Sequence, residues 1–231
     1  SAEKTSWLFP WMSRSGVKGT QRHYTWDGHV RDYLREVKRV ERARHRRREE
    51  HGPAWRLVMA RHMLVSDIDN TLLGDDEALG RLSQELAARG DDLVFAVATG
   101  RTAESAVEVL AEHDVPPPDV VISAVGSELA YGFSNLIADS GWYRHIDHDW
   151  DAAAVRELLD GIAGLELQEE TEQRNYKVSF YADETAPLPR RIRSLLREEG
   201  LRAKVIASHG RFLDVLPERA GKGEAVRYLA G

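Results

Sequence analysis

The fold is decided by one stretch of the chain, Met63-Leu64-Val65-Ser66-Asp67-Ile68-Asp69-Asn70-Thr71. In this stretch a short apolar run leads into a polar segment, where one apolar residue separates two carboxylates. Side chains alternate along an extended backbone, so Asp67 and Asp69 can face the same way. We interpret the apolar run as a buried strand. The carboxylate pair then marks a candidate catalytic site, the alternative being an acidic surface turn.

Strands and helices alternate downstream of this stretch. Apolar spacing predicts helices over residues 77–88 and 102–112, and continuous apolar runs predict buried strands over residues 93–98 and 119–123. This alternation is typical of a parallel sheet with right-handed crossover helices.

From residue 144 the order changes to helix, strand, strand, and this unit occurs twice before a last helix over residues 222–229. The repeat predicts a small sheet covered by two helices and inserted into the first domain. We therefore predict an α/β core over residues 61–143 and 214–231, with an α+β cap over residues 144–213.

The charge is divided unevenly along the 231 residues. Residues 1–60 carry 14 Lys and Arg against 7 Asp and Glu, a net of +7, whereas the remainder carries −13. This split suggests two units that join near Gly52-Pro53. The arginine run at residues 42–48 falls at the end of a predicted helix, where cations are favoured. No aromatic residues interleave the arginines to stack on bases, so we expect no nucleic-acid partner.

Other classes of protein are excluded by composition. The chain has no cysteine, which rules out disulfides, thiolate zinc sites and cysteine nucleophiles. No apolar run approaches the roughly 18–20 residues that cross a bilayer. We expect no membrane partner and a cytoplasmic location.

Polar residues also follow the second predicted strand and open the last helix. Thr99-Gly100-Arg101 is suited to holding an anion on backbone N–H groups, the alternative being a helix cap by Thr99 and Thr102. Gly221-Lys222-Gly223 places a lysine where it could neutralise a phosphoryl group, the alternative being a solvated side chain. Beside two carboxylates whose repulsion Mg²⁺ would offset, these residues predict a phosphate site.

The three motifs, in this order and on these elements, resemble those of the haloacid dehalogenase superfamily of phosphohydrolases. The resemblance implies a Rossmann-like core, with the cap inserted between the second and third motifs. Three further stretches resemble the sucrose-phosphate phosphatases: Val125-Gly126-Ser127-Glu128-Leu129, Tyr176-Lys177-Val178-Ser179-Phe180-Tyr181 and Leu213-Asp214-Val215-Leu216-Pro217.

The resemblance assigns roles to particular residues for hydrolysis of a sugar phosphate, sucrose 6-phosphate. Asp67 would attack phosphorus and form an aspartyl-phosphate, while Asp69 would protonate the departing sugar oxygen and then activate water. Mg²⁺ would be held by Asp67 and the backbone carbonyl of Asp69. The remaining residues would bind substrate: Thr99, Gly100, Arg101 and Lys222 at the phosphate, and Asn175 and Lys177, with Gln173, at the sugar. The alternative for Lys177 is a cation on a strand surface.

Two further features concern the ends of the chain. Gly16-Val17-Lys18-Gly19 and His23-Tyr24-Thr25-Trp26-Asp27-Gly28-His29-Val30 resemble the tail of the glycosyltransferase module of sucrose-phosphate synthases, which implies such a partner module in the same parent protein. The family's fourth motif, with acidic metal ligands, should follow the last helix, yet beyond Lys222 the only acid is Glu224. Three interpretations stay open: a cut chain, a different mechanism, or a non-catalytic module that binds sugar phosphate or regulates an attached synthase.

Overall fold

The computed structural model describes residues 55–183 and 188–231, which belong to one unit, Pro53–Gly231. The predictions made for residues 1–54, including the basic helix and the synthase-like tail, lie outside the described residues.

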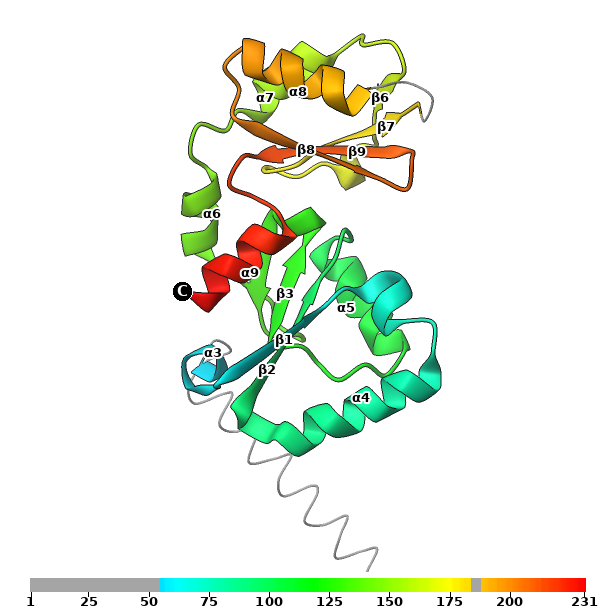
Figure 1. Ribbon diagram of the computed structural model, residues 1–231, viewed down its shortest axis with the longest axis vertical. Helices are drawn as coiled ribbons and strands as arrows, with labels where there is room; N and C mark the ends of the chain where they lie inside the picture. The colour runs from blue at the N-terminus through cyan, green and yellow to red at the C-terminus, as the bar shows by residue number, and fades with distance from the viewer. Residues whose placement is uncertain (1–54, 184–187) are drawn as a thin grey trace, which may run out of the picture. The chain divides into compact units, whose positions relative to one another are not determined.

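The core is built on a sheet of five strands in the order β1-β2-β3-β4-β5 (Figure 1). Its members are β1 (His62–Ser66), β2 (Leu93–Ala98), β3 (Val120–Ser123), β4 (Glu128–Tyr131) and β5 (Ile137–Ala138). The first three are parallel, which confirms the predicted parallel core. The last two run antiparallel and were not predicted, so the sheet as a whole is mixed.

Both faces of the core sheet are covered, as the continuous apolar strands predict. On one face Phe95 and Val97 pack against α4 (Asp76–Arg89) and α5 (Ala103–Glu112). On the other face, Val94 and Ala96 belong to a cluster with residues of α6 (Ser140–Ile146) and α9 (Lys222–Ala230). A short helix, α3 (Trp55–Met59), precedes β1.

The cap has its own sheet, in the order β6-β7-β9-β8, and every neighbouring pair in it is antiparallel. Its elements are α7 (Ala152–Leu159), β6 (Leu165–Leu167), β7 (Val178–Ala182), α8 (Leu188–Glu198), β8 (Ala203–Ser208) and β9 (Phe212–Pro217). The repeated helix-strand-strand unit is therefore observed, and its two helices lie together on one face of the sheet (Figure 1). Strand β9 pairs within this sheet as far as Pro217.

The cap sheet has one apolar and one polar face. Val178 and Phe180 of β7 belong to the buried cluster that includes α7 and α8. Ser179 lies between them in the sequence and therefore faces the other way, as does Asp214 of β9. Both are nearly or fully buried, so polar groups occupy an interior position on the helix-free face.

Four helices begin at a side-chain cap of the expected type, because the first N–H groups of a helix need an acceptor. The caps are Asp75 for α4, Thr102 for α5, Asp139 for α6 and Asp151 for α7. In the part of the chain that the structure describes, no helix combines the length and the apolar character of a membrane span.

Candidate active site

The two carboxylates of the first motif lie at the carboxyl end of β1. Asp67 and Asp69 both have extended backbone angles, and Ile68 between them is fully buried. The alternation predicted from the sequence thus continues past the strand, and both carboxylates line one cleft. Asn70 then turns the chain with a φ of 56°.

Lys222 meets this pair from the far end of the chain. It is the first residue of α9, and its Nζ lies 3.0 Å from Oδ1 of Asp67, 155 positions away in the sequence. Gly221 before it has a φ of 133°, a conformation that L side chains rarely adopt. The structure therefore joins the first and third motifs in one ion pair.

Arg101 is bound to the second carboxylate. Its Nη2 donates to Oδ1 of Asp69 at 2.7 Å and its Nε donates to Oδ2 at 3.0 Å, a two-pronged contact. The hydrogen bond from Arg101 holds the pKa of the Asp69 carboxyl below its usual range, against the opposing effect of burial. Asp69 is consequently kept ionised, which is the form that accepts a proton from water.

The loop between these charged residues is shaped by Thr99. Its side chain is fully buried, and its Oγ1 accepts a hydrogen bond from the backbone N of Arg101 at 3.1 Å. Thr99 is not among the residues that line the cleft, whereas Gly100 and Arg101 are. The helix cap considered as an alternative is made by Thr102, which accepts from the backbone N of Ser105.

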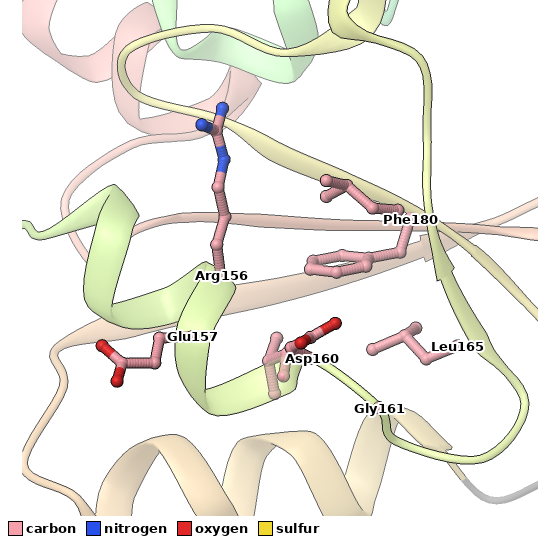
Figure 2. Close-up of a pocket in the computed structure, with 8 residues that line it drawn as sticks. Arg156, Glu157, Asp160, Gly161, Leu165 and Phe180 are labelled. Carbon is pink, nitrogen blue, oxygen red and sulfur yellow. The ribbon is translucent and has the colours of Figure 1, made fainter.

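The cleft has a volume of about 1320 Å³, and its lining comes from both the core and the cap. That volume exceeds what a drug-sized ligand fills, so a disaccharide phosphate has room. A smaller hollow of about 290 Å³ lies beside α7 (Figure 2) and is lined by Arg156, Asp160 and Phe180 among others. None of its lining residues belongs to the cleft.

Lys177 is buried in the cap and lines the cleft, which excludes the interpretation as a cation on a strand surface. Its Nζ lies 3.9 Å from Oδ1 of Asp214, and the same oxygen accepts a hydrogen bond of 2.7 Å from the Ser179 hydroxyl. Burial raises the pKa of the Asp214 carboxyl, and the Lys177 ammonium opposes this rise. Lys177 and Asp214 thus line the cleft, and Ser179 is fully buried and holds the Asp214 carboxyl in place.

The two other cap residues named from the sequence lie elsewhere. Asn175 is exposed and does not line the cleft, and its carbonyl accepts from Nε1 of Trp150. Gln173 is buried, and its amide bonds to the backbone of Gln168 and Ser179. The structure therefore gives Gln173 a role in holding the cap together.

Sequence reasoning missed two cap residues that bond to the core and line the cleft. Nε of Arg174 lies 3.2 Å from Oε1 of Glu128 on β4. Nζ of Lys204 on β8 donates to the carbonyl of Ala220 at 2.8 Å and to Oε1 of Glu224 at 3.3 Å. No local pattern marks either residue, because each contact depends on where the cap sits over the core.

The donor set can be tested for Mg²⁺. Within residues 55–183 and 188–231, no group of three or more His, Asp or Glu side chains is placed to hold a metal. Oδ1 of Asp67 accepts from Lys222, whereas its Oδ2 has no hydrogen-bond donor among the described residues. Mg²⁺ is commonly held by one or two carboxylates, water and substrate phosphate, and Asp67 fits a shared site of that kind.

Comparison with known proteins decides the family. A family model described as sucrose-6F-phosphate phosphohydrolase matches residues 60–231. The chain belongs to this family.

Individual members of the sucrose-6F-phosphate phosphohydrolase family and its relatives agree with this assignment. Sucrose-phosphatase 2 of Nicotiana tabacum is 37% identical over 177 residues, which are 74% of this chain and 41% of that protein. The mannosylfructose-phosphate phosphatase of Agrobacterium fabrum is 30% identical, over 73% of this chain and 69% of that protein. The chain thus spans about two fifths of the length of the curated plant relatives it matches.

Solved structures confirm the predicted fold. The sucrose-phosphatase of Synechocystis sp., in complex with sucrose and phosphate, superposes with a TM-score of 0.68 and 34% identity, covering 74% of this chain and 70% of that one. A haloacid dehalogenase-like hydrolase of Bacillus subtilis, at 20% identity and a TM-score of 0.50, shares the fold alone.

Proposed function

We propose that this chain is the phosphatase module of a Mg²⁺-dependent enzyme that hydrolyses sucrose 6-phosphate through an aspartyl-phosphate on Asp67. The observation that carries the proposal is the 3.0 Å contact between Lys222 and Asp67 inside the cleft that also holds Asp69. Phosphoryl transfer depends on alignment and on stabilised charge, and a lysine beside a carboxylate nucleophile supplies both.

The first half of the reaction follows from the positions of these groups. One oxygen of the Asp67 carboxylate would attack phosphorus, which leaves the other for Mg²⁺. The Lys222 ammonium beside Oδ1 reduces the repulsion between this carboxylate and an incoming phosphate. Bound Mg²⁺ would add positive charge at the phosphoryl oxygens. Direct contact of the Thr99 hydroxyl with phosphate stays a prediction.

Asp69 would act on protons in both halves. For the first half Asp69 would have to be protonated, so that it gives this proton to the departing sugar oxygen and becomes the carboxylate. In the second half that carboxylate would take a proton from the water that hydrolyses the aspartyl-phosphate, which restores the acid. The contact of Asp69 with Arg101 favours the ionised carboxylate, which is the form that hydrolysis of the aspartyl-phosphate needs. We infer that Arg101 turns from Asp69 toward the substrate during the first half.

The cap would select the sugar. Lys177 and Asp214 line the cleft with an ammonium and a carboxyl group, a combination that suits the hydroxyl groups of a sugar. Relatives named for sucrose phosphate and mannosylfructose phosphate support a disaccharide phosphate as substrate. We propose that the parent protein couples this module to a glycosyltransferase of sucrose biosynthesis.

The test is phosphate release from sucrose 6-phosphate with Mg²⁺, by residues 1–231 and by a version extended past Gly231. Asp67→Asn is expected to abolish release, because an amide oxygen is a poor nucleophile. The matched control is Asp160→Asn, which removes an exposed carboxylate beside the separate hollow (Figure 2) and should leave release unchanged. If neither folded version releases phosphate, the proposal is wrong.

A second function is favoured by one observation, the lack of a three-carboxylate metal cluster in the described part of the chain. In this alternative the module binds sugar phosphate without turnover and stabilises or regulates an attached synthase. Calorimetric binding of sucrose 6-phosphate by both versions, with no phosphate released, would favour it. Hydrolysis that Asp67→Asn abolishes would exclude it.

A further inference from the structure

The turn that presents Lys222 is held on its core side by backbone contact. The N–H of Gly221 donates to the carbonyl of Gly126 at 3.3 Å. A Cβ on Gly126 would lie 2.2 Å from the carbonyl carbon of Gly221, so the two backbones touch with no room for a side chain. The core alone therefore fixes one side of this turn.

The other side is held by the cap, through Lys204. Its Nζ donates to the carbonyl of Ala220 at 2.8 Å and to Oε1 of Glu224 in the first turn of α9 at 3.3 Å. A Cβ on Gly221 would lie 3.5 Å from the same Nζ, so the ammonium packs against the glycine directly before Lys222.

Lys204 is itself fixed to the cap sheet. It lies on β8 and pairs with Leu216 of β9, whose next residues lead into the turn. Val205, its neighbour, is buried in the cap cluster. The cap sheet is therefore joined to the turn before α9 in two ways, through the backbone that follows β9 and through the Lys204 ammonium.

Lys204 brings a cation to the start of α9, where the helix dipole does not favour one. The N-terminus of a helix carries partial positive charge, and anions rather than cations are stabilised there. Lys204 adds a second ammonium near Lys222, and Glu224, shared with Arg227, offsets part of that charge. Lys204 is therefore held at this point by its specific acceptors, the Ala220 carbonyl and the Glu224 carboxylate, and not by the helix dipole.

We propose that Lys204 is a positioning residue for Lys222, tying the turn before α9 to the cap sheet so that the phosphate-binding ammonium is held beside Asp67. The inference rests on the proposed function in taking Lys222 as a phosphate ligand. Lys204 acts through the carbonyl of Ala220 and the carboxylate of Glu224, and its effect on chemistry is indirect.

The test compares Lys204→Met with Arg227→Met. Both variants remove a cation from Glu224, but Arg227 belongs to α9 itself and is exposed, so its loss leaves the tie to the cap intact. Amide hydrogen exchange at Gly221 and Ala225 should become about tenfold faster in Lys204→Met and stay within about twofold in Arg227→Met. Titration with inorganic phosphate should show a Kd raised about tenfold in Lys204→Met alone.

A second, milder variant keeps the proposal testable if Lys204→Met fails to fold. Glu224→Gln keeps the hydrogen bond from Lys204 to Ala220 and removes one charge, so exchange at Gly221 should quicken less than in Lys204→Met and more than in Arg227→Met. The positioning role is overturned if amide hydrogen exchange at Gly221 and Ala225 is equally fast in Lys204→Met and Arg227→Met. It is also overturned if exchange in Lys204→Met is faster but its Kd for phosphate is unchanged. The proposed function fails separately, if the unmodified chain and its extended version release no phosphate from sucrose 6-phosphate.

Discussion

Replacing Gly126 with alanine tests how the first and third motifs are joined. A Cβ at this position would lie 2.2 Å from the carbonyl carbon of Gly221 and 2.3 Å from the backbone N of Lys222. Both neighbours are backbone atoms, which cannot rotate out of the way as the end of a side chain can. The turn before α9 must therefore move, or the backbone of residue 126 must change.

The size of the effect follows from two contributions. Gly126 has a φ of 88°, and a side chain in a left-handed conformation costs roughly 1–2 kcal/mol. Relieving the contact requires a shift of about 1 Å, and overpacking of this kind costs about 1–3 kcal/mol. The fold should survive a loss of about 2–5 kcal/mol, since domains have about 5–15 kcal/mol in total. Moving Lys222 by about 1 Å should lower the rate of phosphate release about 100-fold.

The assay is urea unfolding together with phosphate release, with Gly80→Ala as the matched control. Gly80 is exposed in α4, its φ is ordinary, and nothing lies within 4 Å of an added Cβ. There the same substitution should stabilise the chain by about 0.5–1 kcal/mol and leave phosphate release unchanged. A Gly126→Ala variant with the stability and rate of the unmodified chain would refute the reasoning.

Two further predictions concern arginines. Arg56→Met should destabilise the fold by about 3–5 kcal/mol in urea unfolding, because it takes the cation from the Asp119 carboxylate, which is 2% exposed and is bonded through both oxygens. Arg61→Met, which breaks a surface ion pair, should leave the midpoint of urea unfolding nearly unchanged. Arg101→Met should let the pKa of Asp69 rise, so the limb of the pH–rate profile that reports Asp69 should move to higher pH. An unshifted profile would contradict the pairing.

The parallel core was predictable because a strand that is buried on both faces appears in the sequence as a continuous apolar run. Strand β2 coincides with the apolar run at residues 93–98, and α5 begins after the Thr102 cap. Strand β4 was missed because it begins with Glu128 and lacks the continuous buried run of β3, which has the same length. Strand β5 was missed because it has two residues, both exposed. Their place depends on Asp139, which accepts hydrogen bonds from the backbone N of Trp142 and from the hydroxyl of Tyr131, and so joins α6 to β4.

Site residues at the ends of the parallel strands were predictable from the sequence. Site residues whose position depends on how the cap lies over the core were not. Asp67, Asp69 and Arg101 follow parallel strands, and the topology alone brings such positions to one edge of the sheet. Lys204 carries no comparable signal, because its partners in the turn and in α9 become neighbours only after the cap folds over the core. Lys177 was predicted from the sequence as a sugar-binding residue. Its burial beside Asp214 was not predictable, because the alternating pattern of a strand does not show that a lysine is buried.

The turn after β3 shows why local propensity fails at this site. Val125 has a φ of 61°, which is rare for a β-branched residue, and Ala124 before it also has a positive φ. Both N–H groups are used: Ala124 donates to the carbonyl of Arg101 at 2.7 Å, and Val125 donates to the carbonyl of Thr99 at 3.0 Å. The strained backbone thus holds the second motif in place and leads directly into Gly126, which supports the third. Such strain persists only where surrounding contacts impose it, and here those contacts are the ones that assemble the site.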